Sequence, residues 1–269
     1  ADLDEIHWQR ASQAILTTDT HAKLASRVVS VSGSEVTLTG MAKGAGMIRP
    51  DMATMLAFVA TDAEISSVFL DRLFRQAVSA SFNRITVDGD TSTNDAAMMA
   101  ATGCSGIAIE AEGAEAVAAF TQALESLCLE LAQAIIRDGE GATKFVEVQV
   151  DGGADADECD AVAYTIAHSP LVKTALFASD PNWGRLLAAI GRAGLKNLCV
   201  EDVSLYLNDV LIAVNGARAP EYTEAQGQIA MAPPELTIRI DLKRGASSSR
   251  VWTTDFSYDY VRINAEYRT

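Results

Sequence analysis

The sequence predicts a mixed α/β (α+β) fold, because patterns typical of strands and of helices both recur along the chain. The 269 residues are 49% hydrophobic and 21% charged, enough apolar material for one large or two small packed units. No internal repeat or low-complexity segment occurs in the sequence. We therefore expect an ordinary packed protein rather than a repeat array or a fibrous chain.

The charge balance narrows the classes of partner. The formal net charge is −15 at pH 7, and the isoelectric point lies near 4.5. Nucleic-acid phosphates and anionic membrane surfaces repel such a chain, so we expect neither as a partner. No apolar run of about 18 residues and no signal-type segment occurs. The chain opens on Ala1 rather than Met, as if it began part-way into a longer sequence.

Cysteine and histidine spacing argues against a metal site. The cysteines form no CxxC pair, and the histidines show neither HExxH nor a cysteine–histidine ligand pattern. We therefore expect reduced thiols, a cytoplasmic protein and no metal. The residues concerned are Cys104, Cys128, Cys159, Cys199, His7, His21 and His168.

The first elements read as a helix and a hairpin. Apolar residues at helical spacing predict a helix over 5–16, which leads into the polar run Thr17–Thr20. This run is a cap or turn, or a place where substrate is bound. Two β-type runs, 27–32 and 35–39, are separated by Gly33-Ser34 and predict a hairpin.

The hairpin leads into the glycine-rich turn Lys43-Gly44-Ala45-Gly46. The turn lacks the third glycine of a dinucleotide loop and the GK[ST] of a P-loop, so a nucleotide site is not indicated. On the residues alone, Lys43 is either a solvated surface lysine or the partner of a substrate carboxylate.

Residues 55–60 form a short, unbroken apolar run, which predicts a strand buried on both faces. Thr61 and Glu64 have the spacing of a capping box, so we expect a helix from there to about Phe82. The residues expected on its inner face are Ile65, Val68, Phe69, Leu73 and Ala77.

The segment Asp88–Asp95 reads DGDTSTND and is dense in oxygen ligands. It fails the EF-hand pattern, because Thr93 stands where that loop needs glycine. We expect a polar turn ordered by hydrogen bonds and assign no catalytic role within it.

The longest helical pattern spans Gly113 to Arg137 and ends at the sequence DGEGATK. Two glycines there flank Glu140, which is either a solvated turn residue or the partner of a substrate ammonium. The apolar positions of the helix are Phe120, Leu124, Leu127, Leu131 and Ile135.

Strands and helices continue to the end of the chain. Ser179–Asn182 is a helix-start signal, and Arg185 after it is a second candidate for binding an anionic group. The segment 216–234 is expected to be loop with room for one helix. The remaining expected elements are a strand over 145–150, helices over about 160–177 and 182–193, and strands over 198–207, 210–214, 236–242 and 251–256.

A single hydroxyl, Thr54, stands between the glycine-rich turn and the apolar run, and is either a core threonine or a nucleophile. The restrictive pair Pro50-Asp51 limits the backbone that leads to the Ala53–Thr54 bond. Attack of the Thr54 hydroxyl on the Ala53 carbonyl, followed by hydrolysis, would free Thr54 as a new N-terminus. Its α-amine, with a pKa of roughly 8, would then be the general base for its own hydroxyl.

The segment KGAGMIRPDMATMLAFVATDA, residues 43–63, resembles the self-cleavage and nucleophile segment of the ornithine acetyltransferase (glutamate N-acetyltransferase) family of arginine biosynthesis. The resemblance covers nearly the whole chain, and its motifs are long and therefore specific. The other matching stretches, in the same order as in the family, are AILTTDT, TVDGDTSTND, RDGEGATK, SDPNWGRLLAAIGRAG and YVRINAEYRT.

The resemblance implies a fold, a reaction and a division of the chain. The fold would be an N-terminal-nucleophile-like arrangement of stacked mixed β-sheets covered by helices. Thr54 would move the acetyl group from N2-acetyl-L-ornithine to L-glutamate by a ping-pong mechanism, without a cofactor; some members also use acetyl-CoA. Residues 1–53 would be the end of an α chain and 54–269 a β chain, cleaved at Ala53–Thr54 and assembled as two α and two β chains.

The resemblance also implies roles for individual residues. Lys43 would hold a carboxylate and Glu140 an ammonium. Thr17, with its neighbour Thr18 as the open alternative, would contact the substrate, and the C-terminal tail would fold back to bring in Asn264 and Thr269. The implied substrate-binding set is Thr17, Lys43, Thr54, Glu140, Asn264 and Thr269.

One departure from the family leaves alternatives open. The oxyanion-hole threonine–glycine pair of the family lies in an N-terminal portion with no counterpart in this chain, and loss of such a donor reduces rates by about 100- to 1000-fold. That portion is either a separate piece, or the chain is a fragment with impaired chemistry. The alternatives are a self-processing N-terminal-nucleophile aminopeptidase, which the AILTTDT and INAEYRT matches disfavour, and an inactive amino-acid-binding fragment.

Overall fold

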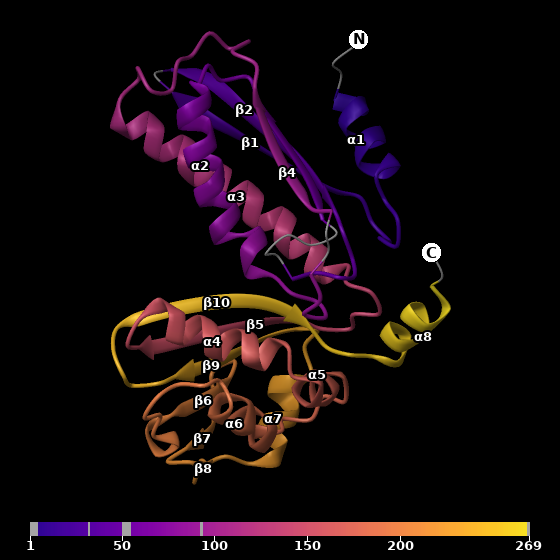
Figure 1. Ribbon diagram of the computed structural model, residues 1–269, viewed down its shortest axis with the longest axis vertical. Helices are drawn as coiled ribbons and strands as arrows, with labels where there is room; N and C mark the ends of the chain where they lie inside the picture. The colour runs from indigo at the N-terminus through magenta and orange to yellow at the C-terminus, as the bar shows by residue number, and fades with distance from the viewer. Residues whose placement is uncertain (1–4, 32, 50–54, 92–93, 268–269) are drawn as a thin grey trace. The chain divides into compact units, whose positions relative to one another are not determined.

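The computed structural model describes residues 5–31, 33–49, 55–91 and 94–267, which form two compact units (Figure 1). Unit 1 comprises Ala1–Ile85 and Asp90–Gly139. Unit 2 comprises Thr86–Gly89 and Glu140–Thr269. Each unit has its own sheet and its own helices.

The described strands of unit 1 form a four-stranded mixed sheet in the order β1-β2-β3-β4. Strand β2 pairs antiparallel with both β1 and β3, and β3 pairs parallel with β4. The strands are β1 (Lys23–Val31), β2 (Ser34–Lys43), β3 (Leu56–Thr61) and β4 (Ala96–Ala101), and the helices are α1 (Glu5–Ala14), α2 (Ser67–Ala80), the 3₁₀ turn η1 (Phe82–Arg84) and α3 (Ala114–Arg137).

Helix α3 packs along the sheet of unit 1, as Figure 1 shows. Its five predicted apolar positions are all buried, so the predicted helix and its inner face are confirmed. Gly40 of β2 permits the close approach, because a Cβ atom there would lie 2.8 Å from Leu127 and 3.0 Å from Leu131. The predicted hairpin is also confirmed, with Val29 opposite Val36.

The strand expected over residues 55–60 exists as β3, but its burial on both faces was a wrong expectation. Ala57, Val59 and Thr61 are buried, whereas the alternate residues are only half-buried. The strand therefore alternates in burial, as a strand with one face against the core does.

The predicted capping box is wrong. Thr61 is the last residue of β3, and its hydroxyl donates to the Thr37 carbonyl at 2.8 Å and accepts from the Ala63 N–H at 3.2 Å. Helix α2 begins only at Ser67. Its inner face includes Leu73 and Ala77 as expected, but Val68 is 82% exposed. Thr61 therefore belongs to the sheet and does not cap a helix, although the local pattern predicted a cap.

The described part of unit 2 contains a six-stranded mixed sheet in the order β10-β5-β9-β6-β7-β8, in which β5 and β9 are parallel and the other pairs antiparallel. Val146, Val148 and Val150 of β5 are fully buried, as their alternation predicted. The strands are β5 (Phe145–Gly153), β6 (Ser204–Leu207), β7 (Val210–Val214), β8 (Ala217–Arg218), β9 (Glu235–Asp241) and β10 (Ser247–Thr254).

The helix expected over 160–177 is two helices. Helix α4 ends at Ala167, and the next helix starts with Pro170, whose ring suits a first helical position and cannot continue an earlier helix. The helix start at Asn182 is confirmed, since its side chain accepts from the Arg185 N–H at 3.1 Å. The helices are α4 (Ala156–Ala167), α5 (Pro170–Phe177), α6 (Trp183–Gly191), η2 (Val200–Asp202), α7 (Glu224–Met231) and α8 (Tyr258–Glu266).

Two further expectations concern the second half of unit 2. The strand expected over 198–207 begins only at Ser204, because Val200–Asp202 forms the turn η2. The one helix expected within 216–234 is α7, which has a capping box at Thr223. Within the described part of the chain, no helix is both long and apolar enough to cross a membrane.

Candidate functional site

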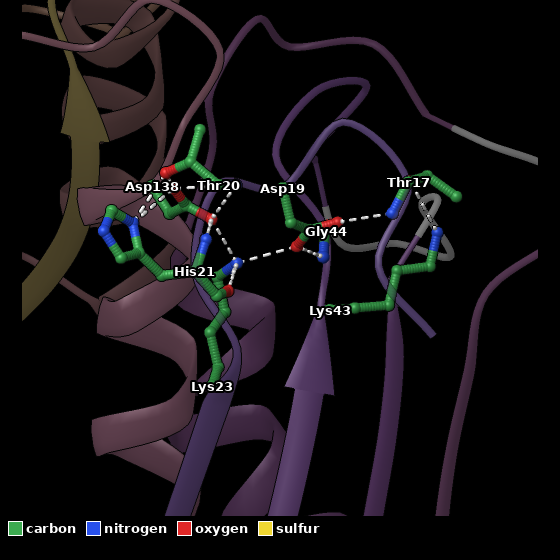
Figure 2. A network of polar contacts seen from close by, with 8 residues as sticks. All are labelled: Thr17, Asp19, Thr20, His21, Lys23, Lys43, Gly44 and Asp138. Carbon is green, nitrogen blue, oxygen red and sulfur yellow. Dashed lines mark hydrogen bonds and ion pairs between the residues drawn. The ribbon is translucent and has the colours of Figure 1, made fainter. Parts of the chain in front are cut away.

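The segment that links α1 to β1 is held by a buried ionic network in unit 1 (Figure 2). The Lys23 ammonium lies 2.7 Å from Asp19 Oδ1 and 2.6 Å from Asp138 Oδ2. The side chains of these residues are 2%, 0% and 7% exposed, respectively. Asp138 follows the last residue of α3, so the network joins the TTDT segment to the end of that helix.

Each carboxylate also accepts backbone hydrogen bonds. Asp19 accepts from Gly44 N at 2.6 Å and from Thr17 N at 3.3 Å. Asp138 accepts from Thr20 N at 3.0 Å, from the Thr20 hydroxyl and from His21 N. Asp19 therefore fixes the backbone of two segments with proposed binding roles, the TTDT run and the glycine-rich turn.

The network lowers the pKa values of both carboxyl groups. Burial alone would raise the pKa of Asp19, but Lys23 and the Gly44 N–H outweigh it. Burial opposes Lys23 and Thr20 in the same way at Asp138, whose pKa also lies below its ordinary value. Both groups are therefore anionic at neutral pH.

Thr17 and Lys43 come together in unit 1. The Lys43 ammonium donates to Thr17 Oγ1 at 3.4 Å, and Figure 2 shows the two side chains pointing toward one another. Lys43 is only 7% exposed, so the solvated-surface interpretation is wrong. Thr17 itself is exposed, and its neighbour Thr18 is half-buried.

Asp95, which was assigned no role, lies close to this region. Its Oδ1 accepts from Met55 N at 2.6 Å, just before β3. Burial raises the pKa of Asp95 to about 6, although the Met55 N–H and the charge of Lys43 oppose the rise. Asp95 therefore gains a proton more readily than an ordinary aspartate.

Glu140 and Asn264 come together in unit 2. Asn264 of α8 donates through Nδ2 to Glu140 Oε2 at 3.0 Å. Glu140 is half-buried, and Asn264 is exposed. The two residues lie 124 positions apart in the chain, so the C-terminal segment does fold back onto the Glu140 turn.

The other candidate residues are not part of these two pairs. Ala53, Thr54 and Thr269 lie outside the described residues. Arg185 donates to the Leu171 carbonyl at 2.7 Å and to Thr174 at 3.3 Å, so its described contacts hold α6 to α5. Among the described side chains, no three His, Cys, Asp or Glu residues are grouped as a metal site would require. All four cysteines are described, and all are free thiols.

Sequence reasoning missed the residues that hold these pairs in place. Lys23, Asp19 and Asp138 were not singled out, and neither was Asp255, which accepts hydrogen bonds from Thr143 and Lys144 just after Glu140. No local sequence signal marked them, because the burial of Lys23 at the start of β1, and with it the need for polar partners, is known only from the fold. The identity of those partners could not be read from the sequence.

Two mixed sheets, each packed with helices, define a protein of the expected α/β (α+β) class. The profile of the ArgJ family matches residues 1–269, and the chain belongs to this family. The chain is 56% identical over 270 residues to the arginine biosynthesis bifunctional protein ArgJ of Pseudomonas fluorescens (strain Pf0-1). It is 55% identical to the protein of the same name from Pseudomonas syringae pv. tomato and from Methylococcus capsulatus.

These relatives are longer than the chain. The alignments cover 100% of the chain and 66% of each Pseudomonas relative, and 99% of the chain and 65% of the Methylococcus protein. The crystal structure of the arginine biosynthesis bifunctional protein ArgJ from Bacillus halodurans matches 78% of the chain and 98% of its own, with a TM-score of 0.73 and 37% identity. The expected family and its N-terminal-nucleophile-like fold class are thus confirmed.

Proposed function

We propose that the protein is an acetyltransferase of arginine biosynthesis, which moves the acetyl group of N2-acetyl-L-ornithine to L-glutamate. The observation that carries this proposal is family membership over the whole chain, with relatives named for arginine biosynthesis at 55–56% identity. The two residue pairs support it, because four candidates chosen from sequence motifs make two direct contacts, Thr17 with Lys43 and Glu140 with Asn264.

The proposed reaction has two half-reactions at Thr54. The Thr54 hydroxyl attacks the acetyl carbonyl, the amide bond breaks, and the ornithine amine leaves with a proton, which gives an acetyl-threonine ester. The glutamate amine then attacks this ester and regenerates the hydroxyl, so the cycle is ping-pong. The α-amine of Thr54 is the general base in both steps and becomes available once the Ala53–Thr54 bond is broken.

The surrounding residues hold the amino-acid skeletons. Lys43, buried and close to Thr17, pairs with a substrate carboxylate. Glu140, whose carboxylate already accepts one hydrogen bond from Asn264, pairs with a substrate ammonium. Thr269 completes the set. No metal or organic cofactor takes part in this scheme.

The proposal extends to processing and assembly. Residues 1–53 form the end of an α chain and residues 54–269 a β chain, and two of each assemble as a heterotetramer in the cytoplasm. The free state of all four cysteines suits that compartment. Acetyl-CoA is proposed as an additional acetyl donor for glutamate.

Intact-mass spectrometry of the purified protein, before and after brief exposure to N2-acetylornithine, tests this proposal. We expect two fragments split at Ala53–Thr54, and one added acetyl group on the fragment that begins with Thr54. Addition of glutamate should remove that group as N-acetylglutamate, and acetyl-CoA should restore it.

Other outcomes of this experiment decide against the proposal. Cleavage followed by release of free acetate, with no transfer to glutamate, would favour an aminopeptidase-type hydrolase. A single unmodified chain that binds ornithine would favour an inactive amino-acid-binding fragment.

A further inference from the structure

Asp255 is a buried carboxylate directly behind the Glu140 turn in unit 2. It follows the last residue of β10 and is 1% exposed. Its two oxygens accept three hydrogen bonds, from Thr143 N at 2.8 Å, from the Thr143 hydroxyl at 2.5 Å and from Lys144 N at 2.9 Å. Because charge-assisted bonds to a buried acceptor are strong, this carboxylate fixes the chain just after Glu140.

The residue next to Glu140, Gly141, is held by the start of α8. The Ser257 hydroxyl donates to the Gly141 carbonyl at 2.5 Å. Gly141 has φ +66°, and a Cβ atom there would collide with the backbone nitrogen of Tyr260. Only glycine allows this approach. Two points of the chain directly after Glu140 are therefore anchored, at Gly141 and at Thr143, and Glu140 itself has Asn264 as a partner.

The segment that carries Asp255 is held by a second buried charge. The Lys173 ammonium donates to Thr253 Oγ1 at 2.9 Å and to the Thr254 carbonyl, and lies 4.6 Å from the centre of the Phe256 ring. That ring stacks on Tyr260 of α8 with centroids 4.5 Å apart. The same short segment thus connects to α5, to the Glu140 turn and to α8.

We propose that Asp255 is a positioning residue for Glu140, which sets the Glu140 carboxylate for the ammonium of the acetyl donor without itself touching substrate. This inference rests on the proposed function, in which Glu140 binds an ammonium. N2-acetylornithine has a single ammonium, at the end of its side chain, because its α-amine is acetylated. Asp255 therefore contributes to the preference for donors that carry this group.

The test compares two acetyl donors with the full protein. N2-acetylornithine and N2-acetylnorvaline share one skeleton, and only the first has the side-chain ammonium. The measured quantity is the ratio of their kcat/KM values for transfer to glutamate. We expect Glu140→Gln to lower this ratio by about 100-fold and Asp255→Asn by about tenfold, chiefly through KM for N2-acetylornithine. In the double variant, Asp255→Asn should lower the ratio no further.

Two more variants separate positioning from stability. Thr143→Val removes one of the three bonds to Asp255 and keeps the side-chain volume, so it should lower the ratio by less than Asp255→Asn. Ser249→Ala is the control, because Ser249 lies on β10, the strand that leads to Asp255, and is also buried, but its hydroxyl donates to Asp160. It should lower the melting temperature and leave the ratio unchanged.

Three outcomes would overturn the inference. In the first, Asp255→Asn and Thr143→Val would lower the melting temperature but leave the donor ratio at the wild-type value, which would make their role structural only. In the second, Glu140→Gln would leave the donor ratio unchanged, which would mean that Glu140 does not bind the ammonium. In the third, the wild-type protein would transfer no acetyl group from either donor, which would overturn the proposed function and this inference with it.

Discussion

Each unit contains buried lysines, and the most deeply buried lysine of unit 1, Lys23, has different partners from that of unit 2, Lys173. In unit 1 the Lys23 ammonium has two carboxylates, Asp19 and Asp138, within 2.7 Å. In unit 2 Lys173 is fully buried, and its described hydrogen bonds go to the hydroxyls of Thr253 and Thr254 and to one carbonyl. The first lysine is part of an ion-pair network, whereas the second relies on neutral acceptors.

The pKa values show what this difference means. In unit 1 the ion pairs outweigh burial, so the pKa values of Asp19 and Asp138 fall below the ordinary value. In unit 2 burial lowers the pKa of Lys173 to about 7, and the charges of Asp255 and Asp88 only partly offset it. Lys23 faces two anionic carboxylates, whereas Lys173 can lose its proton near neutral pH.

The largest expected effect comes from breaking the network of unit 1. Lys23→Met leaves two buried carboxylates without their cation, and we expect it to lower the free energy of unfolding by about 3–5 kcal/mol. Hydrogen exchange of the β1 amides in denaturant, followed by mass spectrometry, measures the loss in unit 1. A loss below about 1 kcal/mol would show that the three charges do not act as a balanced network.

This network also marks how far the sequence could predict the site. Motifs indicated Thr17, Lys43, Glu140 and Asn264, and the structure brings them together in two pairs. The supporting charges could not be predicted, because Lys23 and Asp138 lie 115 positions apart and only the folded chain makes them neighbours. Local patterns carry no information about such a partner.

The fold shows the same division between local and distant causes. The periodicity of α3 and the turn signal of the β1–β2 hairpin depend on neighbouring residues, and both were predicted correctly. Thr61 failed as a cap because its hydroxyl bonds to Thr37 on the paired strand. The break before Pro170 could be predicted from the proline itself, because its missing N–H and its ring prevent an earlier helix from continuing. The apolar periodicity on both sides of Pro170 nevertheless led to the prediction of one helix.

A second comparison between the units concerns two glycines with positive φ. Gly33, in the hairpin of unit 1, has φ +83°, and no atom lies within 4 Å of the position that a Cβ would take. Gly33→Ala should therefore cost only the backbone strain of about 1–2 kcal/mol. Gly141, in the turn of unit 2, has the same backbone constraint, and a Cβ atom there would also collide with the backbone nitrogen of Tyr260. We expect Gly141→Ala to cost about 2–4 kcal/mol and to raise KM for the acetyl donor.

Denaturant unfolding of each glycine variant, together with steady-state kinetics, checks this contrast. Gly33→Ala is the matched control, because it introduces the same side chain at a similar φ and should leave KM unchanged. Equal stability losses and equal KM values in the two variants would mean that the tight contact between Gly141 and α8 does not exist.

The third prediction concerns the pH dependence of stability, which should differ between the two units. Lys173 has a folded pKa of about 7 against 10.5 for an ordinary lysine, so between these values the unfolded chain binds a proton that the folded chain lacks. Stability from this group therefore increases as pH rises above 7, by roughly 2 kcal/mol between pH 7 and 9 relative to Lys173→Met. Asp19 and Asp138, whose pKa values are lowered, affect stability in acid. Their contribution to stability is complete above pH 3.8 and is lost as the pH falls through their pKa values in the folded protein.

Both pH ranges can be measured by unfolding the wild type and Lys173→Met at a series of pH values. Hydrogen exchange is read separately in β1 and in β10. The two proteins should diverge in β10 above pH 7 and behave alike in β1 under acid. Parallel curves in β10 from pH 7 to 9 would mean that Lys173 keeps its proton throughout.

The smallest expected effect is that of Lys173→Met at pH 7, which also serves as the control for Lys23→Met. The substitution removes the desolvation penalty of a partly charged amine, but it deprives the Thr254 carbonyl and Thr253 Oγ1 of a donor. Methionine is flexible and fills a similar volume, so these contributions should nearly cancel and change the free energy of unfolding by less than about 1 kcal/mol. A loss as large as that of Lys23→Met would show that Lys173 is paired with Asp255 as tightly as Lys23 is paired with its two aspartates, and the contrast between the units would disappear.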